Sequence, residues 1–69
     1  MTRDELGLAL WQEQLDQGYG DPGETATEAG LDGWWSNRVE PMDTYDLAAE
    51  GDVAALATVR TEAGLPLFS

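Results

Sequence analysis

An excess of acidic side chains is the feature of this sequence that most limits how it can fold. The 69 residues include 14 Asp and Glu but only three Arg and no Lys, so the formal net charge is −11. Mutual repulsion on this scale destabilises a compact state and favours disorder. Hydrophobic residues nevertheless make up 42% of the chain, with three Trp among them. This supply of apolar side chains predicts a small folded core.

The length of the chain allows one domain, spanning residues 1–69. A domain this small buries little apolar surface and has a thin stability margin. Cys and His are both absent, so neither a disulfide nor a zinc site of the usual Cys/His type can reinforce the fold. We expect no metal and no cofactor.

No targeting segment or membrane span is expected from the sequence. Asp4 and Glu5 follow Arg3 directly, and the apolar run from Leu6 to Trp11 is short, whereas a signal peptide has a basic start and roughly 7–15 apolar residues. No stretch approaches the roughly 20 apolar residues of a membrane span. We therefore expect a cytoplasmic protein that does not bind membranes.

Residues 3–17 have the features of a helix that ends at Gly18. Thr2 and Glu5 have the spacing of a capping box. The apolar residues fall on two nearly opposite faces, with Leu8, Trp11 and Leu15 on one and Leu6 and Leu10 on the other. The second face is interpreted either as the other wall of a helix packed on two sides or as a contact for a partner.

The middle of the chain is less regular. Asp21, Pro22 and Glu24 form a helix-start signal, which predicts a short helix over residues 22–29 stopped by Gly30. Residues 31–41, which include adjacent tryptophans, fit a short strand, a helical turn or an ordered loop. In a strand the two tryptophans would face opposite sides.

The C-terminal third predicts two short helices joined around Gly51. Asp43 or Thr44 can cap the first helix, which reaches Glu50, and Asp52 can cap the second. The expected apolar stripe of the second helix is Val53, Leu56, Val59 and Ala63, and the helix ends at Gly64 and Pro66.

The run from Leu47 to Gly64 resembles the helix pair of an ankyrin repeat. A single repeat of that family cannot bury its own apolar face, and stable stacks need about three. This sequence shows no second copy. We interpret the resemblance as a local similarity between helical hairpins.

The predicted fold is a mostly α single domain of three to four short helices with a Trp-containing connecting segment. A small α+β fold is the alternative. The expected core consists of Leu8, Trp11, Leu15, Trp34, Tyr45, Leu47, Leu56, Val59 and Phe68.

The residue types present argue against an enzyme. Nucleophilic catalysis needs an activating base, and neither His nor Lys is available. Close pairs of carboxylates arise by chance in so acidic a chain, and the acids of residues 43–50 do not fit a calcium-binding loop. We therefore expect no catalytic residues.

The arrangement of the acids is more informative than their number. On a helix, Asp21, Glu24 and Glu28 would form a row along one face, and the residues Asp43, Asp46 and Glu50 repeat that spacing. Such a row rises roughly 4.5–6 Å between neighbours, and phosphates recur about every 3.4 Å along one strand of a duplex. Two rows of carboxylates therefore suit a basic groove built for nucleic acid.

The short, acidic, lysine-free chain resembles phage-encoded DNA-mimic inhibitors of the anti-CRISPR and anti-restriction type. The resemblance lies in composition and implies a non-enzymatic inhibitor that blocks a basic nucleic-acid-binding site, such as that of a CRISPR effector complex. The expected partner is a basic protein surface, and no direct binding of nucleic acid is expected. The candidate partner-binding residues are Asp21, Glu24, Glu28, Asp32, Asp43, Asp46, Glu50 and Trp35.

An interaction or adaptor module is the alternative function. Such a module would bind its partner through exposed Trp34, Trp35, Leu6 and Leu10, and its complex would respond little to salt. A second expectation concerns pH: if the clustered acids mainly repel one another, mild acidification stabilises the fold.

Overall fold

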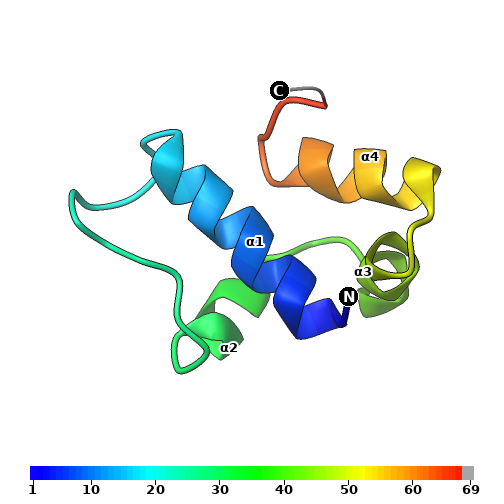
Figure 1. Ribbon diagram of the computed structural model, residues 1–69, viewed down its shortest axis with the longest axis horizontal. Coiled ribbons are helices and arrows are strands. Elements are labelled where there is room, and N and C mark those ends of the chain that lie inside the picture. Colours follow the sequence, from blue (N-terminus) through cyan, green and yellow to red (C-terminus); the bar gives the residue numbers. More distant parts are fainter. Residues whose placement is uncertain (68–69) are drawn as a thin grey trace.

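The computed structural model describes residues 1–67, which form four helices packed around one core (Figure 1). The helices are α1 (Arg3–Asp16), α2 (Leu31–Trp35), α3 (Met42–Ala49) and α4 (Val53–Glu62). Residues 1–67 form no β-strand. The mostly α prediction is therefore confirmed, and the α+β alternative is wrong.

The start and end of α1 follow the expected signals. The Thr2 side chain accepts a hydrogen bond from the Glu5 backbone N–H at 3.1 Å, and the Glu5 carboxylate accepts one from the Thr2 N–H at 2.7 Å. This reciprocal pair is the predicted capping box. The helix ends at Asp16, and Gly18 then adopts a φ of 93°, which a residue with a Cβ atom adopts only at a cost.

The buried face of α1 is the one carrying Leu6 and Leu10, which are 5% and 2% exposed. This face packs on α2 and α3. Leu8, Trp11 and Leu15, the predicted core face, are only half-buried. Trp11 lies close to Gly30 and Leu15 close to Gly20, both in the connection to α2. The helix is therefore packed on two sides, and the face with Leu6 and Leu10 is the more deeply buried of the two.

The helix predicted over residues 22–29 does not form. This segment is a loop that projects to one side of the helices (Figure 1). The start signal makes only a turn, in which the Glu24 N–H donates to the Asp21 carbonyl at 3.1 Å. Alanine is the only apolar side chain of residues 23–29, so a helix here would bury almost nothing. One tether is the Ala26 N–H, which donates to the Gln12 side chain at 3.1 Å.

The tryptophan segment is helical, because Trp34 and Trp35 end the short helix α2. Trp34 is 7% exposed and Trp35 is half-buried. The Trp35 ring meets the Tyr45 ring edge-on, with 4.9 Å between centroids, a favoured geometry for aromatic pairs. Of the three conformations considered for residues 31–41, the structure adopts the helical turn over residues 31–35 and a loop over residues 36–41.

Helices α3 and α4 form the predicted hairpin, with Gly51 at a φ of 105° between them. Asp52 caps α4 by accepting a hydrogen bond from the Ala55 N–H at 2.9 Å. The predicted cap of α3 is wrong: its N-cap is Pro41, which offers no side-chain hydrogen bond. The helix begins at Met42, so Asp43 lies in the first turn, where a negative charge still interacts favourably with the helix dipole.

Helix periodicity explains which core predictions fail. Trp34, Tyr45 and Val59 are buried as expected, whereas Leu47 is 48% exposed. Leu47 is two residues from Tyr45, and two residues turn a helix by about 200°, so the two side chains face opposite sides. Val53 is 80% exposed for a similar reason, since the buried stripe of α4 contains Ala55 and Val59. The predicted core residue Phe68 lies outside the described residues.

We predict that Gly7→Ala destabilises the fold, although alanine favours a helix by about 1 kcal/mol over glycine. A Cβ atom at Gly7 would lie 2.6 Å from Cζ2 of Trp35, and overpacking of this kind costs roughly 1–3 kcal/mol. Gly33→Ala is the matched control, because Gly33 is also helical and a Cβ atom there has no neighbour within 4 Å. Urea denaturation should show opposite signs for the two changes; a stabilising Gly7→Ala would contradict the close approach of Trp35 to α1.

Candidate functional site

All three arginines of the chain form ion pairs that join different parts of the fold. Arg3 on α1 makes two hydrogen bonds of 2.7 Å to Asp46 on α3. Arg38, in the connection between α2 and α3, donates to Glu62 on α4 at 2.8 Å. The remaining arginine, Arg60 on α4, forms a two-pronged pair with Glu13 on α1, one bond of which is 2.9 Å. The chain has no other Lys or Arg.

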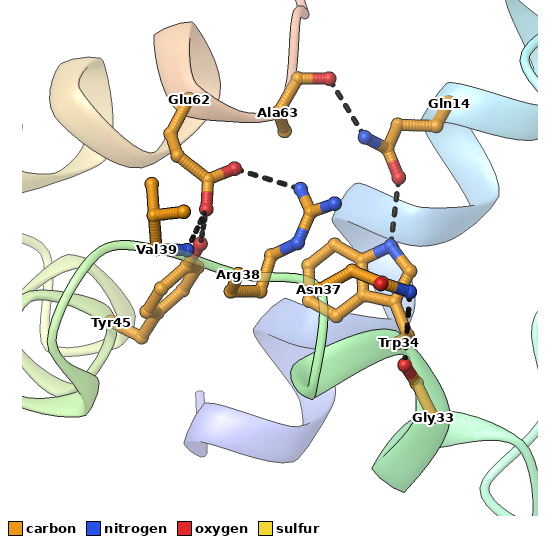
Figure 2. A network of polar contacts seen from close by, with 9 residues as sticks. All are labelled: Gln14, Gly33, Trp34, Asn37, Arg38, Val39, Tyr45, Glu62 and Ala63. Carbon is orange, nitrogen blue, oxygen red and sulfur yellow. Dashed lines mark hydrogen bonds and ion pairs between the residues drawn. The ribbon is translucent and has the colours of Figure 1, made fainter.

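The Glu62 carboxylate is the point at which three parts of the fold meet (Figure 2). It accepts hydrogen bonds from the Arg38 guanidinium at 2.8 Å, from the Val39 N–H at 3.0 Å and from the Tyr45 hydroxyl at 3.0 Å. The Glu62 side chain is only 8% exposed. A buried carboxylate is stable when its charge is paired and its lone pairs are used, and here both conditions hold.

The same network continues through Trp34 to α1 (Figure 2). The Arg38 guanidinium carbon lies 4.6 Å from the centre of the Trp34 ring, a favourable cation–π position. The Trp34 indole N–H donates to the Gln14 side chain at 2.7 Å, and Gln14 donates in turn to the Ala63 carbonyl at 2.7 Å. The Arg38 Nε atom is buried without an acceptor among the described residues, so part of the guanidinium is held by packing alone.

Burial and the neighbouring Glu62 carboxylate both raise the pKa of Tyr45 well above its ordinary value of 10.0. Burial is the larger cause, because it penalises the charged phenolate. The hydroxyl therefore stays protonated and remains a hydrogen-bond donor to Glu62. Tyr45 is 0% exposed, and its role is structural: it donates a hydrogen bond to Glu62.

Once the three pairs are formed, 14 − 3 = 11 carboxylates have no arginine partner. They lie on α1, α2 and α3 and in the connections between the helices, whereas α4 contains none of them. They are Asp4, Glu5, Asp16, Asp21, Glu24, Glu28, Asp32, Glu40, Asp43, Glu50 and Asp52. No Lys or Arg of the chain remains to neutralise them.

The first predicted row of acids is not a helical row. Asp21, Glu24 and Glu28 are exposed, but they lie in the loop between α1 and α2. Asp32 is exposed on α2, and Trp35 is half-buried against Tyr45. The loop presents its carboxylates to solvent without the regular spacing expected of a helix face.

The second predicted row does lie along α3, but its central member is paired. Asp43 and Glu50 are exposed, whereas Asp46 is bound by Arg3. The Asp46 pair raises the pKa of Arg3, and the nearby carboxylates of Asp4 and Asp43 raise it further. The contact between the start of α1 and α3 is therefore the Arg3–Asp46 pair, which the separation in sequence did not reveal.

Sequence reasoning missed the network around Glu62. The available signal was the scarcity of bases: with three arginines among 14 acids, each arginine was certain to have candidate partners. Which acid each one selects depends on the tertiary packing of α4 against the other elements, and periodicity within one helix does not report it.

Three of the four residues expected to serve an adaptor surface are part of the core. Leu6, Leu10 and Trp34 are 5%, 2% and 7% exposed, so a partner cannot reach them without unfolding. Among the described residues, no group of three or more acids is placed to hold a metal ion. None of the helices in residues 1–67 is long and apolar enough to cross a membrane.

Comparison of the chain with protein-family models, with curated proteins and with solved structures gives no match. Function is therefore inferred from the charges and contacts of this chain alone.

We predict that Glu62→Gln destabilises the protein by about 3 kcal/mol or more, because it leaves the buried Arg38 charge without a counter-ion. Asp46→Asn is the control: it also removes the acid of an arginine pair, but that pair is about 40% exposed and screened by water, so stability should change little. Tyr45→Phe should fall between them, since it removes one donor to Glu62. Equal losses from Glu62→Gln and Asp46→Asn in denaturant melts would contradict the central position of Glu62.

The folded protein should lose stability in acid. Hydrogen bonds from Arg60, Arg3 and Thr2 hold the pKa of Glu13, Asp46 and Glu5, respectively, below their ordinary values of 4.5, 3.8 and 4.5. A carboxyl with a lowered folded pKa stabilises the fold above its unfolded pKa, and this contribution disappears as pH falls through the folded pKa. For these three groups the direction is opposite to the stabilisation by acid expected from mutual repulsion.

The measurement is a series of thermal melts in low salt between about pH 7 and pH 3, with Glu13→Gln as the matched variant. The melting temperature of the native sequence should fall below about pH 4.5, and the fall should be smaller in the variant, which lacks one of the titrating groups. A melting temperature that rises steadily to pH 3 would show that repulsion outweighs the paired acids.

Proposed function

We propose that this protein is a non-enzymatic inhibitor that presents carboxylates as a DNA mimic and blocks a basic nucleic-acid-binding site, such as that of a CRISPR effector complex. One observation carries the proposal: every arginine is committed to an ion pair between elements, and eleven carboxylates remain without an arginine partner. The bases of this chain are used to hold the fold together, and the remaining surface charge is negative.

The cost of this arrangement supports a use for it. Like charges on a small surface repel one another and destabilise the compact state. A surface selected for stability would carry interspersed Lys and Arg, and this chain has no Lys. The negative field also attracts a basic partner from a distance and accelerates association.

The dimensions of the molecule fit a short piece of duplex. Its longest axis is 32 Å, close to the roughly 34 Å of one DNA turn. The acidic loop between α1 and α2 lies at one end of this axis, and α3 lies towards the other (Figure 1). Carboxylates at both ends would allow contacts spread along a basic groove about one turn long.

The adaptor alternative loses three of its four proposed contact residues, since Leu6, Leu10 and Trp34 are buried and only Trp35 is partly accessible. We keep the inhibitor as the proposed function. As a mimic of nucleic acid rather than a ligand for it, the protein itself should give no gel shift with DNA or RNA at moderate salt.

The test is a competition experiment with purified CRISPR effector complexes and restriction enzymes as candidate targets. The protein should prevent DNA binding by its target, and its association with that target should slow steeply as salt rises. Neutralising Glu24, Glu28, Asp43 and Glu50 together should reduce the association rate roughly tenfold or more, while single changes do little. These four acids are exposed, and none of them is bound by an arginine.

The matched control carries Thr25→Ala and Ala29→Gln, which alter the same exposed loop without changing its charge. This control should inhibit as well as the native sequence. A target bound at an unchanged rate by the fourfold neutralised variant would refute the mimic, because the summed field is the property proposed to drive association.

A further inference from the structure

A groove between the C-terminal end of α1 and the outer side of α4 is left open by the packing of residues 1–67. Leu56, Arg60 and Leu67 line two clefts, one of about 210 Å³ and one of about 430 Å³. The clefts share these three residues and are therefore adjacent, and we refer to the two together as the groove. Its two ends differ in chemistry.

One end of the groove is apolar. It is lined by Val53, Leu56, Ala57 and Leu67, together with the stem of Arg60. Val53 is 80% exposed and Leu67 is 50% exposed, so each leaves apolar surface in water. The cleft of about 210 Å³ is smaller than the roughly 300–1,000 Å³ of small-molecule pockets. Its size suits side chains of another protein rather than a metabolite.

The other end of the groove is acidic, and it is lined by Glu13, Asp16 and Gln17 from the end of α1. The Arg60 guanidinium already binds Glu13 and the Pro66 carbonyl. Asp16 accepts a hydrogen bond from the Gln12 amide at 3.1 Å but pairs with none of the three arginines. The last turn of α1 has no basic residue, although the C-terminal end of a helix favours a cation. This end of the groove therefore attracts a positive charge from outside the chain.

We propose that this groove binds a segment of the partner protein in which an aliphatic side chain stands next to Lys or Arg. The aliphatic side chain would cover Val53 and Leu67, and the basic one would lie beside Asp16. A second copy of this chain is a poor occupant, because two molecules with a net charge of −11 each repel one another. The inference rests on the proposed function only in taking the partner to be basic, since it concerns different residues from the neutralised acids.

The test uses capped synthetic peptides as probes. The matching peptide is Gly-Ser-Leu-Leu-Lys-Lys-Ser-Gly, and the controls replace either both Leu by Ser or both Lys by Gln. Titration into ¹⁵N-labelled protein should shift the amide signals of Asp16, Ala57 and Leu67 most. The matching peptide should bind roughly three- to tenfold more tightly than either control, the range expected for loss of a surface charge contact or an exposed apolar contact.

Two variants with matched controls locate the contact. Val53→Ser should weaken binding of the matching peptide roughly threefold, whereas Val39→Ser, at an equally exposed valine elsewhere, should not. Asp16→Asn should remove the preference for Lys over Gln, whereas Asp32→Asn, at an exposed acid of α2, should preserve it. All four sites are on the surface or half-exposed, so the fold should tolerate each change.

Three results would overturn the inference. Equal binding of the three peptides would exclude a matched segment, and shifts centred on the loop of residues 18–30 would place the contact elsewhere. Concentration-dependent shifts at the groove without peptide would assign it to a second copy of the chain. If the peptide binds as expected but the fourfold neutralised variant inhibits normally, the groove proposal is supported and the DNA-mimic proposal is refuted. If the peptides do not bind selectively but the fourfold variant loses inhibition, only the groove proposal is refuted.

Discussion

The Glu62 carboxylate sets the geometry on which the rest of the fold depends. It receives hydrogen bonds from Arg38, Val39 and Tyr45, so one buried group fixes α4, α3 and the irregular connection that precedes α3. Arg38 is held in turn over the Trp34 ring. A chain with a small apolar core and short helices gains specificity from such a contact, because few other arrangements satisfy a buried carboxylate.

The acidity of the chain comes from its composition, and ion pairing decides which of the acids are left without a basic partner. Each arginine bridges two elements, and together the three pairs connect α1 with α3, α1 with α4, and α4 with the connection between α2 and α3. Bases placed in these positions hold the fold together but no longer neutralise the surface. Different acids therefore serve stability and surface charge in this chain. Three acids stabilise the fold through arginine pairs, and the remaining eleven face outwards or cap helices.

Local signals predicted the local structure well. The Thr2 capping box, the Asp52 cap and the turns at Gly18 and Gly51 follow from residue type at a helix end, which does not depend on distant parts of the chain. The helix over residues 22–29 failed because a start signal cannot maintain a helix without an apolar face to bury. The faces of α1 were interchanged because both carry leucines, and only tertiary packing decides which one meets α2 and α3.

The candidate site was predictable in composition but not in arrangement. Exposed acids at positions such as Glu24 and Asp43 follow from the excess of charge, whereas the pairing of Asp46 with Arg3 joins residues 43 positions apart. Because Asp21, Glu24 and Glu28 lie in a loop, the exposed acids form an acidic loop and one acidic helix rather than two regular helical rows. Spacing within a helix therefore predicts the second row and not the first.

The central claim is that all three arginines are held in ion pairs within the fold and leave eleven carboxylates without an arginine partner. Paramagnetic relaxation of the amide protons by a cationic and by an anionic nitroxide, compared residue by residue, measures the local electrostatic potential directly. We predict stronger relaxation by the cationic probe throughout the loop of residues 18–30 and along α3, with no position near Arg3, Arg38 or Arg60 that favours the anionic probe. A positive potential beside any of these three arginines would show that its ion pair is open in solution and would contradict the account.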